Sequence, residues 1–318
     1  MDILEILGLS GIIPVIVIDD EKDAVPTAKA LLEGGIGVLE ITMRTPAGVK
    51  AIAAVRSALP EMVVGAGTVL SMQQLEAAME AGAQFIVSPS YNEEIVEYCL
   101  QKQIPITPGC VTPTEIERAL AKGFRVLKFF PASVYGGVSA LQALNGPYPM
   151  VSFIPTGGIN EGNLKDYVDK PYIYAVGGGW LASKGDMAAG NFAKITATAH
   201  RAVNILLGLE LAHVGINGSD NADAMSTAEK FGNLLGQEVV PGNSSVFAGK
   251  GIEVNMAMGI GKNGHIAIST CNIQRAVYYL QKRGFKFDMS TKKERGGRMI
   301  AIYTEDEIGG FGVHLLQR

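Results

Sequence analysis

Strand-like and helix-like segments alternate between residues 12 and 208, and this alternation limits the folds open to the chain. Short apolar runs are followed by amphipathic stretches, with glycine or proline at many of the joints. The predicted strands are Ile13–Ile18, Val38–Met43, Met62–Ala66, Phe85–Ser88, Pro105–Pro108, Val126–Phe130, Ser152–Pro155 and Tyr172–Val176. A repeated strand–helix unit requires parallel strands joined by crossovers. The pattern therefore predicts an α/β fold, a (β/α)8 TIM barrel, with a doubly wound open sheet as the alternative.

Composition limits the classes of partner. The chain has 318 residues, of which 47% are hydrophobic, and this is enough for a barrel plus a smaller domain. A net charge of −4 without a basic run argues against a nucleic-acid partner. Three cysteines without a C-x-x-C spacing indicate neither a disulfide framework nor a cysteine zinc site. The apolar run Ile12–Ile18 is too short to span a bilayer, so we expect a cytoplasmic protein without a membrane partner.

Lys128 is an isolated charge within the apolar segment 125–131. Successive strand side chains point to opposite faces, so Lys128 shares its face with Val126 and Phe130 and has no evident route to water. Burial disfavours the ammonium form of a lysine, and a neutral amine can attack a carbonyl carbon to form a Schiff base. The alternative is a lysine at a strand end that reaches solvent or pairs with a carboxylate.

Charged side chains also follow one face of the second predicted strand. Glu40 and Arg44 fall on the same face as Thr42, and in a barrel this face is the interior. An inward carboxylate and guanidinium are costly unless they are paired or used. One explanation is a structural Glu40–Arg44 ion pair at the barrel mouth. The other is chemical: Arg44 binds a substrate carboxylate, Lys128 condenses with the adjacent ketone, and Glu40 moves protons.

Glycine-rich segments follow the seventh and eighth predicted strands. They are Thr156-Gly157-Gly158 and Gly177-Gly178-Gly179. A TIM barrel commonly offers backbone N–H groups to a phosphate at this place, although tight βα turns use glycine as well. Combined with the residues above, these segments predict a substrate with a 2-keto acid at one end and a phosphate at the other.

Four segments, in this order, resemble the 2-keto-3-deoxy-6-phosphogluconate / 4-hydroxy-2-oxoglutarate (KDPG/KHG) aldolase family of class I pyruvate aldolases. They are Glu40-Ile-Thr-Met-Arg44-Thr45, Gly65-Ala-Gly-Thr68-Val-Leu, Lys128-Phe-Phe-Pro131-Ala and Thr156-Gly-Gly-Ile159. The resemblance covers residues 1–208. It implies cleavage of KDPG to pyruvate and glyceraldehyde 3-phosphate, or of KHG to pyruvate and glyoxylate. It also implies a small keto-acid substrate, no cofactor for this reaction, and a homotrimer.

The resemblance further implies roles for individual residues. Lys128 is expected to form the Schiff base, and Glu40 is expected to act as the general acid and base. The substrate-binding residues that it implies are Arg44 and Thr68 at the pyruvyl carboxylate, Pro89, Phe130 and Thr156 along the pocket, and Gly157, Gly158 and Gly179 at the phosphate.

The sequence departs from the family pattern at two positions. Gly179 stands where the family usually has the serine of Gly-Gly-Ser-Trp, and a hydroxyl donor to the phosphate is thereby lost. Ser90 replaces the glycine that usually follows Ser-Pro. The residues therefore support the pyruvate half of the substrate better than the phosphorylated half.

The pattern changes after Gly208. Residues 209–318 hold two similar halves, each with a strand, a polar turn, an amphipathic helix and further strands. His213-Val-Gly-Ile-Asn begins one half and His265-Ile-Ala-Ile-Ser begins the other. We therefore predict two domains, a barrel over 1–208 and a smaller α+β domain over 209–318.

Three of the four histidines are predicted to share one sheet face with a glutamate. The two halves resemble the vicinal-oxygen-chelate (glyoxalase/bleomycin-resistance) fold of two βαβββ modules. In its metal-binding members each module supplies one ligand from its first strand and one from a later strand, and this pattern matches His213, Glu253, His265 and His314. Such ligands suit zinc, nickel, iron or manganese. His314 stands where a glutamate is more usual, so histidines on a half-solvated sheet face are the alternative.

Two functional hypotheses follow. The first is a pyruvate aldolase whose C-terminal domain serves binding, oligomer packing or regulation. The second is a barrel that binds a sugar-acid phosphate, with metal-dependent chemistry in the C-terminal domain. Glu40, Arg44, Thr68 and Lys128 are all present, and this favours the first.

Overall fold

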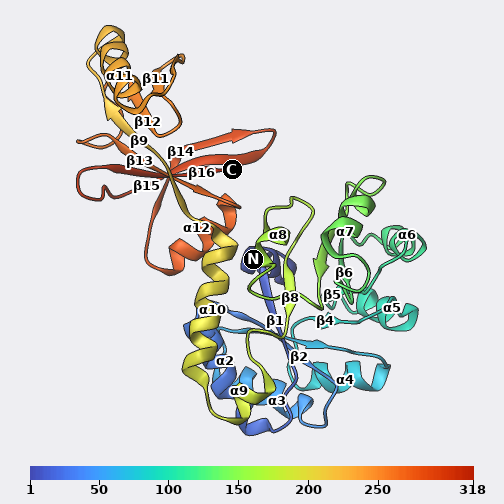
Figure 1. The fold of residues 1–318 in the computed structure, drawn as a ribbon. Coiled ribbons are helices and arrows are strands. Elements are labelled where there is room, and N and C mark those ends of the chain that lie inside the picture. The colour runs from blue at the N-terminus through green and yellow to red at the C-terminus, as the bar shows by residue number, and fades with distance from the viewer. The chain divides into compact units, whose positions relative to one another are not determined.

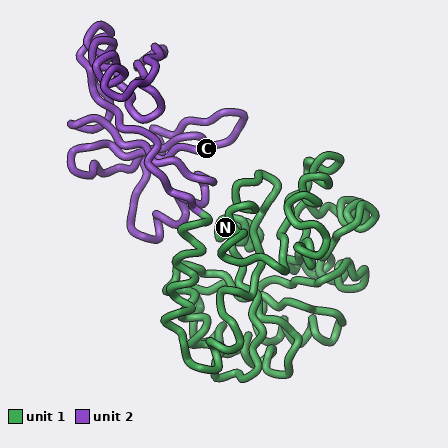
Figure 2. The backbone as a smooth tube through the Cα atoms, in the orientation of Figure 1, with its two compact units in different colours: residues 1–206 green, residues 207–318 purple.

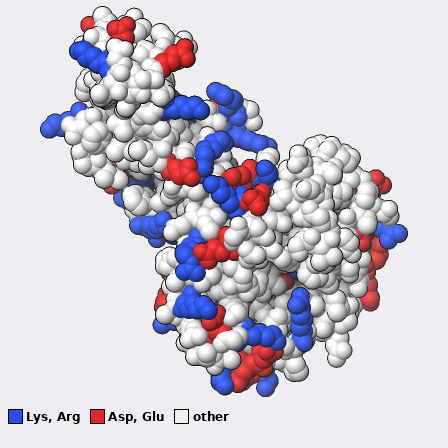
Figure 3. Space-filling view, in the orientation of Figure 1, with Lys and Arg blue, Asp and Glu red and all other residues white.

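The computed structural model describes residues 1–318, which divide into two compact units (Figures 1 and 2). Unit 1 is Met1–Leu206 and unit 2 is Leu207–Arg318. None of the helices combines the length and the apolar character that crossing a bilayer requires. On the face of unit 1 that Figure 3 shows, acidic and basic side chains are interspersed.

Unit 1 alternates parallel strands with helices that lie outside them (Figure 1). Its strands are β1 (Ile12–Ile16), β2 (Val38–Thr42), β3 (Val63–Gly67), β4 (Ile86–Val87), β5 (Ile106–Thr107), β6 (Val126–Phe129), β7 (Ser152–Pro155) and β8 (Val176–Gly178). Its helices are α1 (Ile3–Ser10), α2 (Ala24–Glu33), α3 (Gly48–Ala58), α4 (Met72–Glu80), α5 (Glu93–Gln101), α6 (Pro113–Ala121), α7 (Gly137–Asn145), α8 (Leu164–Val168) and α9 (Lys184–Ala188), and α10 (Phe192–Leu207) follows them. The predicted βα repeat is therefore confirmed.

Eight strands form a closed ring in unit 1. Six pair continuously in the order β5-β4-β3-β2-β1-β8, and β6 pairs with β7. A single bridge between Gly109 and Lys128 joins β5 to β6, and another between Thr156 and Gly177 joins β7 to β8. These two bridges close the circle, which distinguishes a barrel from an open doubly wound sheet.

One strand lies later in the chain than predicted. We expected the eighth strand at Tyr172–Val176 and read the following glycines as a loop, but β8 spans Val176–Gly178. Gly177 and Gly178 pair with Ile13 and Pro14 of β1. Glycine is needed there because a Cβ on Gly177 would lie 2.2 Å from Oγ1 of Thr156. The close approach of β7 thus explains glycine inside a strand.

The N-terminal ends of the strands are filled by apolar side chains. Ile13, Val38 and Val63 begin their strands and form one buried cluster with Phe85 and Ile154. Ile3, Leu4 and Ile6 of α1 pack against this cluster. This cluster therefore fills one end of the barrel interior, and polar side chains are left to the C-terminal strand ends, where this fold carries its chemistry.

Unit 2 is an eight-stranded sheet with two helices, in the predicted order of two βαβββ modules. The first module contains β9 (Glu210–Asn217), α11 (Asn221–Leu235), β10 (Val239–Pro241), β11 (Ser245–Ala248) and β12 (Ile252–Asn255). The second contains β13 (His265–Thr270), α12 (Ile273–Lys282), β14 (Phe287–Arg295), β15 (Arg298–Thr304) and β16 (Gly312–Gln317). The sheet order is β10-β11-β12-β9-β13-β16-β15-β14, so the first strands of the modules, β9 and β13, meet antiparallel at its centre.

Candidate active site

A buried ion pair lies inside the barrel. Lys128 on β6 is 4% exposed and Glu40 on β2 is 3% exposed. The Nζ atom of Lys128 lies 3.2 Å from Oε1 of Glu40 and donates a hydrogen bond to it. We considered a structural ion pair between Glu40 and Arg44 as one explanation of these charges. That explanation is wrong, because the Glu40 carboxylate pairs with Lys128. The two buried charges stabilise each other across the barrel. Because they are in contact in an apolar interior, a proton can pass from the Lys128 amine to the Glu40 carboxylate.

Gly67 on β3 makes room for the Glu40 carboxylate, a role that the sequence reasoning missed. A Cβ on Gly67 would lie 2.0 Å from Oε1 of Glu40. The two residues belong to paired strands, with Thr42 beside Gly67 in the register. The sequence does contain a pattern that could have indicated this role. Gly65 and Gly67 are two residues apart, so they lie on the same face of the strand, and glycines in a strand often mark a place where another group approaches the backbone closely.

Gly67→Ala is expected to reduce aldolase turnover by roughly tenfold to a hundredfold while the protein stays folded, because general acid–base catalysis depends on the position of the carboxylate. The clash is with the end of a flexible side chain, so the Glu40 carboxylate moves rather than the backbone. Steady-state kinetics and thermal unfolding measure the two effects. Gly123→Ala in an open turn is the control for adding a methyl group, although its φ of 91° adds local strain. Unchanged turnover in Gly67→Ala would contradict the role of this space.

Arg44 and Thr68 meet at the mouth of the barrel, beyond the ends of β2 and β3. The Nε atom of Arg44 donates a hydrogen bond of 3.0 Å to Oγ1 of Thr68. Arg44 is exposed, so its remaining guanidinium N–H groups can meet an incoming carboxylate. Thr68 has a φ of 55°, an uncommon left-handed conformation for a β-branched residue. Such strain concentrates at functional sites.

The remaining predicted pocket residues also lie at C-terminal strand ends. The ring centroid of Phe130 is 5.5 Å from Nζ of Lys128. Thr156 follows β7 and is buried, with its backbone bridged to Gly177. Pro89 follows β4, and its carbonyl oxygen would lie 2.2 Å from a Cβ on Gly109, so the β4 and β5 ends are packed closely. The structure thus places these residues around the mouth that holds Lys128.

The predicted phosphate glycines follow β7 and β8. Gly157 and Gly158 have φ angles of 95° and 78°, which are accessible to glycine at little cost. The N–H group of Gly158 has no hydrogen-bond acceptor within the protein, whereas that of Gly157 faces Gly177 across the bridge that joins β7 to β8. Gly179 is exposed at the end of β8. A free backbone donor at this edge suits an anion.

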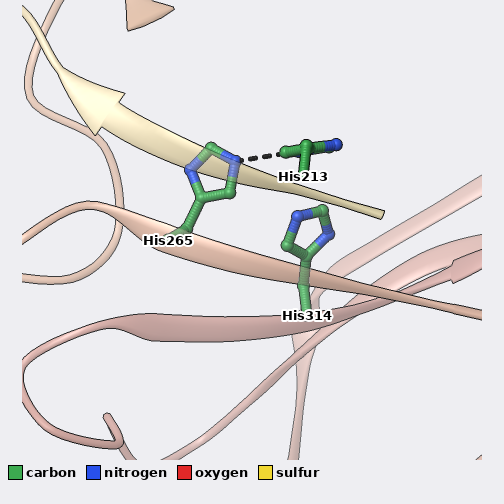
Figure 4. A group of neighbouring side chains, drawn as sticks. All are labelled: His213, His265 and His314. Carbon is green, nitrogen blue, oxygen red and sulfur yellow. Dashed lines mark hydrogen bonds between the residues drawn. The ribbon is translucent and has the colours of Figure 1, made fainter. Parts of the chain in front are cut away.

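A second polar cluster lies in unit 2 (Figure 4). His213, His265 and His314 come from β9, β13 and β16, and their nearest ring nitrogens lie within 4.8 Å of one another. Glu253 on β12 joins them, with Oε2 at 2.9 Å from Nε2 of His213 and 3.2 Å from Nε2 of His265. The structure therefore brings together all four predicted ligands, two from each module.

Neighbouring side chains hold this cluster in place. The Ser245 hydroxyl donates a hydrogen bond of 2.6 Å to Oε1 of Glu253. Tyr303 stacks on the His314 ring at 4.6 Å between centroids. Gly215 gives the His265 ring its space, because a Cβ there would lie 1.9 Å from that ring. Sequence reasoning did not identify these three supporting residues.

The electrostatics of the cluster favour the protonation states in which these side chains can bind a metal ion. Burial alone would raise the pKa of Glu253, but hydrogen bonds from His213, His265 and Ser245 outweigh it and lower that pKa below the usual carboxyl range. Burial, reinforced by the nearby His265 and His213, lowers the pKa of His314 to about 3. Glu253 is therefore ionised and His314 neutral near pH 7, and these are the forms that coordinate metals. Both ring nitrogens of His314 are buried without a hydrogen-bond partner.

Comparison with known proteins agrees with the barrel site. Residues 3–198 match the family described as KDPG and KHG aldolase. The 2-dehydro-3-deoxy-phosphogluconate aldolase of Treponema pallidum is 45% identical over 204 residues, 64% of this chain and 97% of the relative. The KHG/KDPG aldolase of Escherichia coli K12 is 44% identical over 198 residues, 62% of this chain and 93% of the relative.

A solved structure supports the same relationship. The KDPG aldolase of Legionella pneumophila, determined with pyruvate captured as a covalent carbinolamine, has a TM-score of 0.61 and 38% sequence identity. The alignment covers 63% of this chain and 97% of that one. The family match ends at residue 198 and so does not include unit 2. Sequence, fold and barrel site agree, and the chain belongs to the KDPG and KHG aldolase family of lyases.

Proposed function

We propose that unit 1 is a class I aldolase that cleaves KDPG to pyruvate and glyceraldehyde 3-phosphate, KHG to pyruvate and glyoxylate, or both. The observation that carries this proposal is the buried contact of 3.2 Å between Lys128 and Glu40. It provides a nucleophilic amine and a proton acceptor in one enclosed place. The names of the relatives support the choice of substrates.

The first half of the reaction forms the Schiff base. Glu40 accepts a proton from Lys128, and the neutral amine attacks C2 of the keto acid. Glu40 then returns the proton to the hydroxyl of the resulting carbinolamine, which leaves as water, so that an iminium forms and Glu40 is again a carboxylate. Arg44 and Thr68 hold the carboxylate beside C2, and fixing two groups in attack geometry can lower the barrier by about 7 kcal/mol or more.

The second half breaks the C3–C4 bond. Glu40 removes the proton of the C4 hydroxyl, directly or through water, and the C4 oxygen becomes the carbonyl oxygen of the released aldehyde. The electron pair of the broken bond moves into the iminium and gives an enamine of pyruvate. Protonation of C3 and hydrolysis then release pyruvate and restore Lys128. These steps use the side chains of the barrel alone.

Pyruvate release from KDPG and from KHG tests the proposal directly. The assay couples pyruvate to lactate dehydrogenase, and it is run with and without a chelator. We expect cleavage of at least one substrate at a rate that the chelator leaves unchanged. Cleavage that stops with chelator would favour the alternative, a sugar-acid-phosphate binding barrel with metal-dependent chemistry in unit 2. The absence of cleavage of both substrates would refute the aldolase.

We also propose a divalent metal site in unit 2, formed by His213, Glu253, His265 and His314. The unpartnered, buried ring nitrogens of His314 favour it over a set of satisfied histidines. Three imidazoles and a carboxylate suit zinc, nickel, iron or manganese. When bound, such an ion supplies a Lewis acid for an oxygen ligand. Ser245 and Tyr303 would orient Glu253 and His314 around it.

His265→Ala is expected to remove most of the bound metal, because it deletes one ligand and leaves Glu253 with one fewer partner. Elemental analysis after zinc titration, with a chelator wash, measures the metal content. His200→Ala is the matched control, since His200 is exposed on α10 in unit 1. Equal metal content in His265→Ala and the parent protein would remove His265 from the ligand set.

The assembly and compartment remain part of the proposal. We propose a homotrimer, on the resemblance to the aldolase family, and sedimentation equilibrium would count the subunits. We propose a reducing, cytoplasmic setting because Cys99 and Cys110 are buried free thiols. Burial raises the pKa of the Cys99 thiol to about 12 and that of Cys110 likewise, so both thiols stay protonated. Fractionation of cells followed by immunodetection would test the compartment.

A further inference from the structure

The segment that follows the Lys128 strand runs beside the glycine segment that follows β7. The N–H group of Ala132 donates a hydrogen bond of 2.7 Å to the carbonyl oxygen of Thr156. The N–H group of Ser133 donates a hydrogen bond of 3.1 Å to the carbonyl oxygen of Gly157. Two consecutive bonds fix the backbone of Ser133 next to the predicted phosphate glycines.

The Ser133 hydroxyl occupies the space that Gly158 leaves open. A Cβ on Gly158 would lie 2.0 Å from Oγ of Ser133 and 2.4 Å from its Cβ. Every residue other than glycine at position 158 would therefore displace this hydroxyl. The positive φ of Gly158, 78°, adds a second reason for glycine there.

The donors gathered here are unused within the protein. The Ser133 hydroxyl makes no hydrogen bond to the chain, and it does not cap α7, whose N-cap residue is Gly136. The N–H group of Gly158 also has no acceptor. Ser133 is exposed, so a ligand can reach its hydroxyl. Two free donors on adjoining segments, the Ser133 hydroxyl and the Gly158 N–H group, fit a ligand rich in acceptor oxygens, as a phosphate is.

We propose that Ser133 is a specificity-determining residue whose hydroxyl binds the distal phosphate of the substrate. This inference rests on the proposed aldolase function. Lys128 attacks C2 of the substrate, and KDPG carries its phosphate at the opposite end, on C6. Ser133 would thus supply a hydroxyl donor that Gly179, at the end of β8, does not have.

Ser133→Ala tests the proposal through the ratio of two substrates. KHG is the internal reference, because it is shorter and has no phosphate. We expect kcat/KM for KDPG to fall about tenfold relative to that for KHG, mainly through KM, as the loss of a hydrogen bond to a charged group predicts. Inorganic phosphate should inhibit KDPG cleavage competitively, and Ser133→Ala should raise its inhibition constant. Ser139→Ala, on the exposed side of α7, is the matched control.

A second variant tests whether the hydroxyl itself matters. Gly179→Ser in the Ser133→Ala background should restore part of the lost preference for KDPG. An added Cβ at Gly179 lies no closer than 3.2 Å to other atoms, the nearest being the carbonyl oxygen of Val15. Recovery supports phosphate binding by a hydroxyl at this edge.

Four results would overturn the proposal, and they are distinguishable. Unchanged kcat/KM values for both substrates in Ser133→Ala remove the residue from the phosphate site. An equal fall for both substrates shows that Ser133 shapes the loop instead of binding phosphate. A parent protein that cleaves KHG but not KDPG has no productive phosphate site, although the aldolase stands. A parent protein that cleaves neither substrate refutes the aldolase itself, and the Ser133 proposal fails with it.

Discussion

Lys128→Ala is expected to abolish pyruvate release, with kcat lower by at least about 10⁴-fold, because no other group can form the covalent bond to C2. Lys128 is the cation paired with Glu40 inside the barrel, at 3.2 Å. Treatment with pyruvate and borohydride should add the mass of a reduced pyruvyl group to the parent protein at Lys128. Peptide mass spectrometry locates the modification.

The controls for Lys128 separate chemistry from stability. Removing the cation leaves the Glu40 carboxylate buried without its partner, which typically destabilises a protein by about 3 to 5 kcal/mol. Lys128→Arg keeps the positive charge but cannot become a neutral nucleophile, so it should be folded and inactive. Lys102→Ala, exposed after α5, should retain full activity. Borohydride trapping at any lysine other than Lys128 would overturn the assignment.

Glu40→Gln is expected to lower kcat by roughly 10² to 10⁴-fold, the usual range for a general acid–base group. The amide keeps the size of the side chain, so the space beside Gly67 remains filled. It cannot accept the proton of Lys128 or of the C4 hydroxyl. Slow borohydride trapping of pyruvate should nevertheless still label Lys128, because the nucleophile is present.

Turnover and trapping together decide the role of Glu40. A normal kcat in Glu40→Gln would reduce Glu40 to a structural partner of Lys128. Complete loss of trapping would show that Glu40 is required for Schiff-base formation, before the C3–C4 bond breaks. Gly67→Ala provides a comparison in which the carboxylate is retained but displaced.

The period of two in strands made the barrel site predictable. Lys128 and Glu40 each interrupt an apolar strand on the face that points inward, and the βα repeat places both strands in one ring. The structure agrees, with the two side chains in contact. The same alternation placed Arg44 on the face of Glu40, and the family motifs then added Thr68, whose contact with Arg44 lies just beyond the strands.

Features that depend on register were not predictable. Gly67 matters because it has no side chain and so leaves room for the Glu40 carboxylate. This role can be recognised only when the pairing of β2 with β3 is known. β8 was placed too early because Gly177 and Gly178 have the composition of a turn but pair with β1. Ser133 likewise acquires its neighbour Gly158 only through the contact between two loops. Such contacts join residues that are distant in sequence, and local preferences carry no information on them.

The equal division of the histidine cluster between two repeats has a thermodynamic consequence. Each repeat contributes one side chain from its first strand and one from its last, across the central β9–β13 junction. Neither repeat alone offers a tridentate chelate. An ion bound as we propose would therefore link occupation of the cluster to association of the repeats, and would stabilise the β9–β13 junction.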